Sequence, residues 1–191
     1  MIWIAGGLLT FFLYLIYDLN SVLWQKKILH GFFFLGNILL AGVTVVQILE
    51  AVSEVRLGAC FWIFAVLSGV FLLLLIDTLF FALPFECTYL EVGKKPCVCD
   101  FGMYALCRHP GVLWFFLFYF CLGIALYPAE LIYAGMFYSI LNLCYVIFQD
   151  HWTFPLTFAD YENYKRTTPF LIPNQRSIRR AIQTRRSKQS E

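Results

Sequence analysis

The chain has 191 residues, of which 61% are apolar, and its 14 basic and 12 acidic residues make up only 14% of the sequence. Soluble domains average about 45–50% apolar and about 25% charged residues, so this composition excludes an ordinary soluble domain and, more firmly, a disordered chain. Aromatic residues contribute 19%, which suits lipid contact and interfacial belts. We therefore expect an all-α integral membrane protein.

A membrane-spanning helix needs about 20 mostly apolar residues, and the sequence contains five such runs. In chain order they cover residues 1–17, 28–49, 59–83, 112–127 and 131–148. The turn signal Pro128-Ala129-Glu130 separates the last two runs, which predicts a tight helical hairpin. We expect a three-helix membrane part over 1–84, a part over 85–173 with a polar loop, the hairpin and the segment after it, which the family resemblance described below implies to be the catalytic region, and a basic tail over 174–191.

The basic residues are distributed unevenly between the two sides that five spans define. One side holds only Arg56, whereas the other holds thirteen residues: Lys26, Lys27, Lys94, Lys95, Arg108, Lys165, Arg166, Arg176, Arg179, Arg180, Arg185, Arg186 and Lys188. Cytoplasmic loops of membrane proteins carry the excess of Lys and Arg. This bias predicts a multi-pass protein with its N-terminus outside, its C-terminus in the cytoplasm, and any active site on the cytoplasmic face.

Four of the seven cysteines share the predicted loop between the third and fourth spans. They are Cys87, Cys97, Cys99 and Cys107. Their spacing lacks the paired two-to-four-residue separations of structural zinc sites, so reduced thiols are the simpler interpretation and zinc is the alternative. We expect no metal site.

The first informative stretch, residues 100–114, reads DFGMYALCRHPGVLW and lies just before the fourth span. It has the features of a juxtamembrane segment, with Pro110 starting a helix and Tyr104 and Trp114 at the interface. Arg108 and His109 adjoin that helix start, where unpaired N–H groups and the helix dipole favour negative charge. This arrangement predicts an anionic ligand.

The second informative stretch, residues 149–173, reads QDHWTFPLTFADYENYKRTTPFLIP and follows the fifth span. By itself it predicts a short amphipathic surface helix with Phe158, Tyr161 and Tyr164 on one side, followed by an apolar anchor between two prolines. This interpretation explains the shape of the segment and not its purpose.

Together the two stretches resemble the membrane-embedded methyltransferase superfamily that includes isoprenylcysteine carboxyl methyltransferases and phospholipid N-methyltransferases. The matching elements, in order, are Gly102-x-Tyr104, Arg108-His109-Pro110, a two-span hairpin, an acidic position, Phe158-x-x-Tyr161-x-x-Tyr164, and Pro169-Phe170-Leu171-Ile172-Pro173. The resemblance covers about the C-terminal half. The family has two adjacent glutamates after the last span, whereas this chain has Gln149-Asp150, or Asp150-His151 if the alignment shifts by one residue.

The resemblance implies S-adenosylmethionine as a methyl donor bound at the cytoplasmic face and a lipophilic acceptor that enters from the bilayer. It assigns catalytic roles to Arg108, His109 and Asp150, and cofactor binding to Gly102, Tyr104, Arg108, His109, Pro110, Trp114, Gln149, Asp150 and Tyr161. The donor's sulfonium suits aromatic faces or an acid, and its carboxylate suits a basic fork. His109 would accept a proton from the acceptor or bond the cofactor, or else only cap the helix.

Two further features have open interpretations. Asp77, near the predicted cytoplasmic end of the third span, would line the site or occupy a helix end. The tail carries several arginines, and Ile178 and Ile182 lie one helical turn apart, so it would lie on anionic lipid or be a solvated, orientation-setting tail.

Gly36, Gly42 and Gly69 are expected to allow close helix packing.

We expect membrane lipids and a lipophilic substrate as partners and no nucleic acid, because topology already explains the basic residues. An NADPH-dependent enzyme resembling sterol reductases and a non-enzymatic membrane scaffold are the alternatives to a methyltransferase.

Overall fold

The computed structural model describes residues 2–52, 57–81 and 95–188, and every regular element in those ranges is a helix. Four continuous helical stretches are long and apolar enough to cross a membrane: Ile2–Trp24, Lys27–Val52, Ala59–Phe80 and Ala129–Thr157. Pro110–Leu126 is a shorter apolar helix of 17 residues. It is about 25 Å long, at the lower limit for a span. The prediction of an all-helical chain is confirmed for the described residues, and four of the five predicted spans are long and apolar enough to cross a membrane, with Pro110–Leu126 as a shorter fifth.

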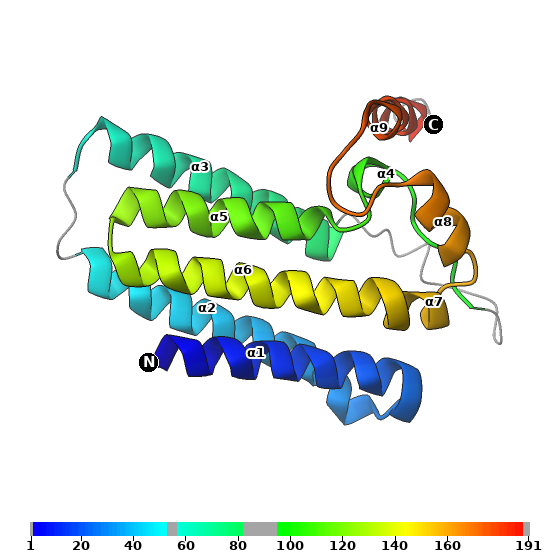
Figure 1. The fold of residues 1–191 in the computed structure, drawn as a ribbon, viewed down its shortest axis with the longest axis horizontal. Helices are drawn as coiled ribbons and strands as arrows, with labels where there is room; N and C mark the ends of the chain where they lie inside the picture. The colour runs from blue at the N-terminus through cyan, green and yellow to red at the C-terminus, as the bar shows by residue number, and fades with distance from the viewer. Residues whose placement is uncertain (1, 53–56, 82–94, 189–191) are drawn as a thin grey trace.

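The long helices are α1 (Ile2–Leu19), α2 (Gly31–Val52), α3 (Ala59–Ile76), α5 (Pro110–Leu126) and α6 (Ala129–Phe148). They run side by side with alternating direction, and α5 lies between α3 and α6 (Figure 1). The predicted hairpin of the last two spans is present as α5 and α6. It turns at Tyr127, whose φ of 69° is left-handed, and Pro128 follows directly.

Buried aromatic residues fill the centre of the bundle. Tyr138 is fully buried, and its hydroxyl donates a hydrogen bond of 2.9 Å to the carbonyl oxygen of Trp3. The hydroxyls of Tyr119 and Thr44 are 2.6 Å apart and join α5 to α2. These bonds satisfy polar groups that lipid cannot hydrate.

Small residues allow close approach at some helix contacts. A Cβ atom on Gly36 would lie 2.6 Å from Cε1 of Tyr14, and one on Gly7 would collide with the ring of Tyr138. The predicted packing role of Gly36 is thus confirmed. The same prediction is wrong for Gly42 and Gly69, because a Cβ on either would meet no atom of the described part of the chain within 4 Å.

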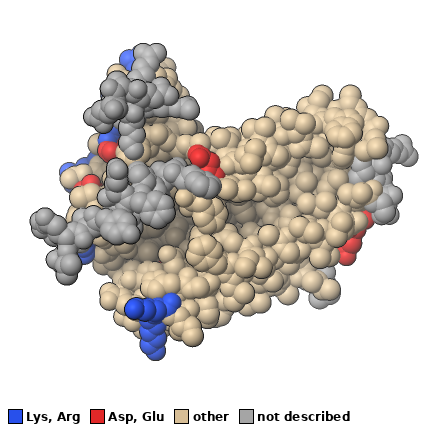
Figure 2. Space-filling view, turned by 180° about the vertical axis from the view of Figure 1, so that it is seen from behind, with Lys and Arg blue, Asp and Glu red and all other residues tan. Residues whose placement is uncertain are grey.

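Four shorter helices gather at one end of the bundle, where α1, α3 and α6 end and α5 begins (Figure 1). They are α4 (Met103–Leu106), α7 (Phe154–Thr157), α8 (Tyr161–Thr167) and α9 (Gln175–Lys188). Figure 2 shows blue Lys and Arg atoms at that end of the visible face and a long uncharged surface beside them. The end with the short helices is therefore also the basic end of the bundle.

Three of the long helices finish in π-helical turns at this basic end: Asn20–Trp24 after α1, Asp77–Phe81 after α3 and Gln149–Thr153 after α6. Such turns are rare and occur frequently at functional sites. The first helix runs beyond the predicted end at residue 17 because Asp18 and Asn20 are buried. Asn20 bonds both the backbone N–H and the carbonyl of Lys26, which satisfies its amide inside the fold.

Candidate functional site

A buried ion pair lies at the basic end of the bundle. Arg108 donates from Nε to Oδ1 of Asp150 over 2.8 Å and from Nη2 to Oδ2 over 3.0 Å. The two side chains are 10% and 4% exposed. A buried charge is costly unless it is paired and hydrogen-bonded. Burial of either Arg108 or Asp150 without the other would therefore destabilise the fold.

Two more side chains converge on the same carboxylate. Nε2 of His109 lies 3.2 Å from Oδ1 of Asp150, and the Tyr161 hydroxyl donates to Oδ1 over 2.6 Å. Asp150 comes from the π turn after α6, Arg108 and His109 precede α5, and Tyr161 begins α8. The structure thus brings together four residues predicted from two separate stretches of sequence, and we call them the Asp150 cluster.

In the π turn after α6, the consecutive residues Gln149, Asp150 and His151 have different partners. Nε2 of Gln149 donates to the hydroxyl of Tyr145 over 2.9 Å, and Gln149 also interacts with Asp18 of α1. His151 is exposed, and its Nδ1 lies 2.9 Å from the carbonyl oxygen of Ile147. Of the three residues that fit the family's acidic pair, Asp150 alone joins Arg108.

Arg108 also binds the segment that follows α8. Its Nη1 donates to the carbonyl oxygens of Thr168, over 2.8 Å, and Lys165, over 3.3 Å. Its backbone N–H donates to Pro169, and the N–H of His109 donates to Phe170. These bonds tie both motifs into one unit. They also occupy the basic fork that the sequence assigns to a ligand carboxylate, because four of the five guanidinium N–H groups already have acceptors.

Aromatic rings surround the cluster. The His109 ring stacks on Phe154 with centroids 5.9 Å apart, and Phe170 meets it edge-on at 5.0 Å. The guanidinium of Arg108 lies 5.5 Å from the centre of the Phe170 ring. Neither phenylalanine was among the predicted site residues, although both belong to the second motif and Phe170 belongs to its proline-bounded end.

His109 is neutral at pH 7. Burial lowers its pKa below the ordinary value of 6.5, and this effect outweighs the opposing influence of Asp150. The charge of Asp150 is already balanced by Arg108. Because the carboxylate only accepts hydrogen bonds, the proton of the neutral ring must be on Nε2, which leaves the lone pair on Nδ1. Nδ1 is therefore available as a base.

A second layer of hydrogen bonds lies beside the cluster. The Tyr164 hydroxyl donates to the carbonyl oxygen of Tyr104 over 2.6 Å, and the Tyr104 hydroxyl donates to that of Thr78 over 2.9 Å. Burial raises the pKa of both tyrosines, so both remain protonated donors. This chain connects α8, α4 and the end of α3. Thr78 makes the contact, while the neighbouring Asp77, a predicted site candidate, is exposed.

Three further predicted residues have backbone or packing roles. Gly102 directly precedes α4 and has a φ of 61°, which favours glycine, and buried Pro110 is the first residue of α5. Trp114 stacks on Phe71 with centroids 6.2 Å apart, at the contact of α5 with α3. Its indole Nε1 is buried and has no hydrogen-bond partner among the residues that the structure describes. Trp114 lies one turn beyond the Asp150 cluster along α5 and does not belong to it.

Asp18 is a buried acid that the sequence interpretation missed. It is 2% exposed, interacts with Tyr145 and Gln149, and accepts a 3.4 Å bond from Thr153. The available signal was an acid at the end of an apolar run, which in membrane proteins suggests function. Asp18 holds the far side of the π turn that carries Asp150.

The loop cysteines differ in environment. Cys97 is exposed, whereas Cys99 and Cys107 are buried, and burial raises the pKa of Cys107 to about 11. Cys87 lies outside the described residues. Within the described ranges, His, Cys, Asp and Glu form no group of three that would hold a metal ion.

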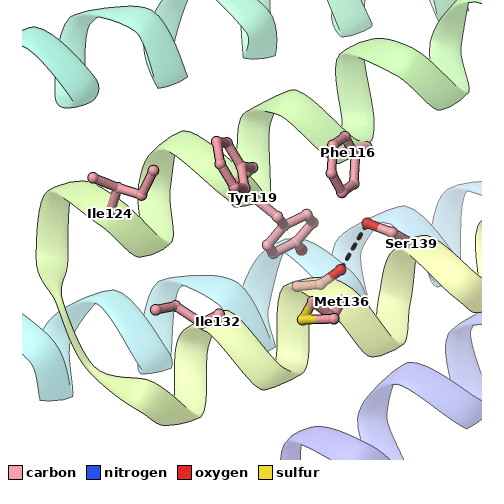
Figure 3. A pocket seen from close by; sticks show the side chains of 8 residues that line it. Phe116, Tyr119, Ile124, Ile132, Met136 and Ser139 are labelled. Atoms are coloured by element: carbon pink, nitrogen blue, oxygen red, sulfur yellow. Dashed lines mark hydrogen bonds between the residues drawn. The ribbon is translucent and has the colours of Figure 1, made fainter.

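A groove of about 230 Å³ lies between α5 and α6, away from the Asp150 cluster (Figure 3). Its lining is almost wholly apolar, and the hydroxyl of Ser139 is bonded back to the carbonyl oxygen of Gly135 over 2.7 Å. The lining residues are Phe116, Tyr119, Phe120, Ile124, Ile132, Gly135, Met136 and Ser139.

Comparison with known proteins adds no relative: no family model, no curated protein and no solved structure matches this chain.

Proposed function

We propose that the protein is an S-adenosylmethionine-dependent methyltransferase that acts on a lipophilic acceptor dissolved in the membrane. The observation that carries the proposal is the Asp150 cluster. Residues of both methyltransferase-like stretches, 42 positions apart in the case of Arg108 and Asp150, meet around one buried carboxylate. A scaffold protein would not need this convergence of a base, an acid and a phenol.

The chemical groups around the cluster fit a sulfonium ligand. The charge of Asp150 stays paired with Arg108. The rings of Phe154, Tyr161 and Phe170 supply faces that attract a cation. Lys165 is the basic side chain that would exchange its partner for the ligand carboxylate, because the Arg108 guanidinium is occupied. Its Nζ lies 5.7 Å from the centre of the Tyr161 ring and pairs with exposed Glu162 over 2.8 Å. When bound, S-adenosylmethionine supplies an activated methyl group.

The residues of the chain then have three tasks. Arg108 and Tyr161 hold Asp150 in one orientation, so that the site is organised before a ligand arrives. His109 accepts the proton of an amine or thiol acceptor at Nδ1 and releases it afterwards, while a carboxylate acceptor needs no base. Burial of His109 and Asp150, which are 7% and 3% exposed, excludes water from the reacting centre.

The surroundings favour an apolar acceptor. The cluster lies at the end of helices with extensive exposed apolar surface, and the groove between α5 and α6 is open to an acyl or prenyl chain. We place this end in the cytoplasm, with the N-terminus outside, because nearly all Lys and Arg residues belong to it. The acceptor headgroup is thus a prenylcysteine carboxylate, a phospholipid amine or a similar group.

Cofactor binding tests the proposal. The full chain, purified in detergent, is titrated in a calorimeter with S-adenosylmethionine and, separately, with NADPH. We expect saturable heat with the first ligand and none with the second. Binding of NADPH alone would support a reductase, and binding of neither would remove the enzyme assignment. Incubation with methyl-labelled donor and either total lipid or prenyl-peptide extract then identifies the acceptor by the fraction that becomes labelled.

A further inference from the structure

The C-terminal helix α9 presents a basic surface with an apolar stripe. The helix contains Arg176, Arg179, Arg180, Arg185, Arg186 and Lys188 and no acidic residue. Ile178 and Ile182 lie one turn apart and are 42% and 51% exposed. Exposed isoleucines on a cationic helix are typical of helices that lie in the headgroup region of a membrane.

The orientation of α9 is fixed by the rest of the fold. Asn174 caps its start, accepting a 2.9 Å bond from the N–H of Ser177, and Ser177 is 1% exposed. Arg180 forms an ion pair with Asp100, in the segment before α4. Ser177 and Arg180 thus face the body of the protein, and Ile178 and Ile182 remain outside that contact.

The position of α9 relative to the bundle is that of a helix parallel to the membrane surface. Figure 1 shows α9 end-on, whereas the long helices run across the page, so its axis is nearly perpendicular to theirs. Along the bundle axis it lies no farther out than the end of α1. At that end Trp24 is 50% exposed and is followed by Lys26 and Lys27, residues typical of a membrane interface.

We propose that α9 is an interfacial anchor that binds anionic lipid headgroups of the membrane that contains the bundle. The exposed Arg176 and Arg179 attract the headgroups, and the two isoleucines enter the boundary of the acyl chains. This resolves the sequence alternatives for the tail in favour of lipid. It is independent of the methyltransferase proposal, because no residue of the Asp150 cluster belongs to α9.

Hydrogen exchange in nanodiscs tests the anchor. The full chain is placed in nanodiscs of phosphatidylcholine alone or with 30% phosphatidylglycerol, and exchange of the α9 amides is followed by mass spectrometry. We expect exchange at least tenfold slower with the anionic lipid, and a return to the neutral-lipid rate in 0.5 M salt. Equal α9 exchange in the two lipids would overturn the proposal and leave the helix to solvent or an acidic protein.

Variants of α9 separate the contribution of its positive charge from that of its inserted isoleucines. We expect Arg176→Gln/Arg179→Gln and Ile178→Ser/Ile182→Ser each to remove most of the lipid effect, because both attractions are needed. Arg166→Gln, in α8, is the matched control for loss of a cation, and it should leave the effect unchanged. An unchanged lipid effect in both α9 variants would overturn the proposal. Exchange in α5 reports whether each variant keeps the fold.

Discussion

The guanidinium of Arg108 and the carboxylate of Asp150 face each other at two points, with N to O distances of 2.8 and 3.0 Å, and join the start of α5 to the end of α6. The helical hairpin is thereby closed at the end opposite its own turn. The same guanidinium bonds the carbonyl oxygen of Thr168, so the segment after α8 is closed onto the hairpin as well. One buried pair organises the whole basic end.

Breaking this pair should destabilise the fold. Asp150→Asn leaves the Arg108 charge buried without a counter-charge, and such losses cost about 3–5 kcal/mol. We expect a clear drop in the melting temperature of the detergent-purified protein. Glu162→Gln, which removes the acid of an exposed i,i+3 pair with Lys165, is the control and should change stability by less than about 0.5 kcal/mol. An unaltered melting temperature in Asp150→Asn would show that the pair is dispensable.

The contribution of His109 to stability should fall as the pH drops below about 6.5, the value at which an unfolded histidine takes up a proton. Burial lowers the pKa of His109, so just below pH 6.5 the histidine binds a proton in the unfolded state more readily than in the folded state. Between the two pKa values the slope is positive and at most about 1.4 kcal/mol per pH unit. The measurement is thermal unfolding at pH 7.5, 6.5 and 5.5, and His109→Gln should remove this component. An identical pH profile in the variant would refute the assignment to His109.

Two glycines should differ in their response to alanine. Gly7→Ala places a methyl group against the buried ring of Tyr138, which must move and strain its bond to Trp3, and we expect a loss of about 1–3 kcal/mol. Gly69→Ala enters open space on α3 and should be neutral or slightly stabilising, because alanine favours helix. Unfolding in denaturant or heat compares the two, and equal effects would contradict the packing of α1 against α6.

Membrane topology is testable at Cys97, which is exposed near the basic end. With the C-terminal side in the cytoplasm, a membrane-impermeant maleimide should label Cys97 in permeabilised cells and leave it unlabelled in intact cells. The Cys97→Ser chain measures the background from the other cysteines. Equal labelling before and after permeabilisation would place this end outside.

The long helices could be predicted from sequence because an apolar run of membrane length is a strong signal that needs no knowledge of contacts. Helix ends were less predictable. Asp18 and Asn20 suggested an end at residue 17, yet their side chains are buried and satisfied by partners that only the fold brings near. The sequence likewise predicts packing roles for Gly42 and Gly69, which are exposed, because it does not show which side of an apolar helix meets a neighbour.

The residues of the Asp150 cluster could be predicted from sequence, whereas the hydrogen-bond partners of the residues around it could not. Arg108, His109, Asp150 and Tyr161 were all identified and do converge. Gln149, next to Asp150, was expected beside it, but the π turn directs it toward Tyr145 and Asp18. The use of the Arg108 fork could not be foreseen either, because its acceptors at Asp150, Lys165 and Thr168 are 42, 57 and 60 residues away.

The most direct test of the central claim is the affinity for S-adenosylmethionine of two tyrosine variants in the same short helix. Tyr161 bonds the Asp150 carboxylate and Tyr164 bonds a backbone carbonyl, each over 2.6 Å, so Tyr161→Phe and Tyr164→Phe each remove one hydrogen bond of the same length from a different partner. A bond to a charged group contributes about 1.5–3 kcal/mol. Calorimetric titration should show affinity reduced about tenfold or more in Tyr161→Phe and within twofold of the original in Tyr164→Phe. Equal affinities in the two variants, or no binding by the unaltered chain, would contradict a donor site built on Asp150.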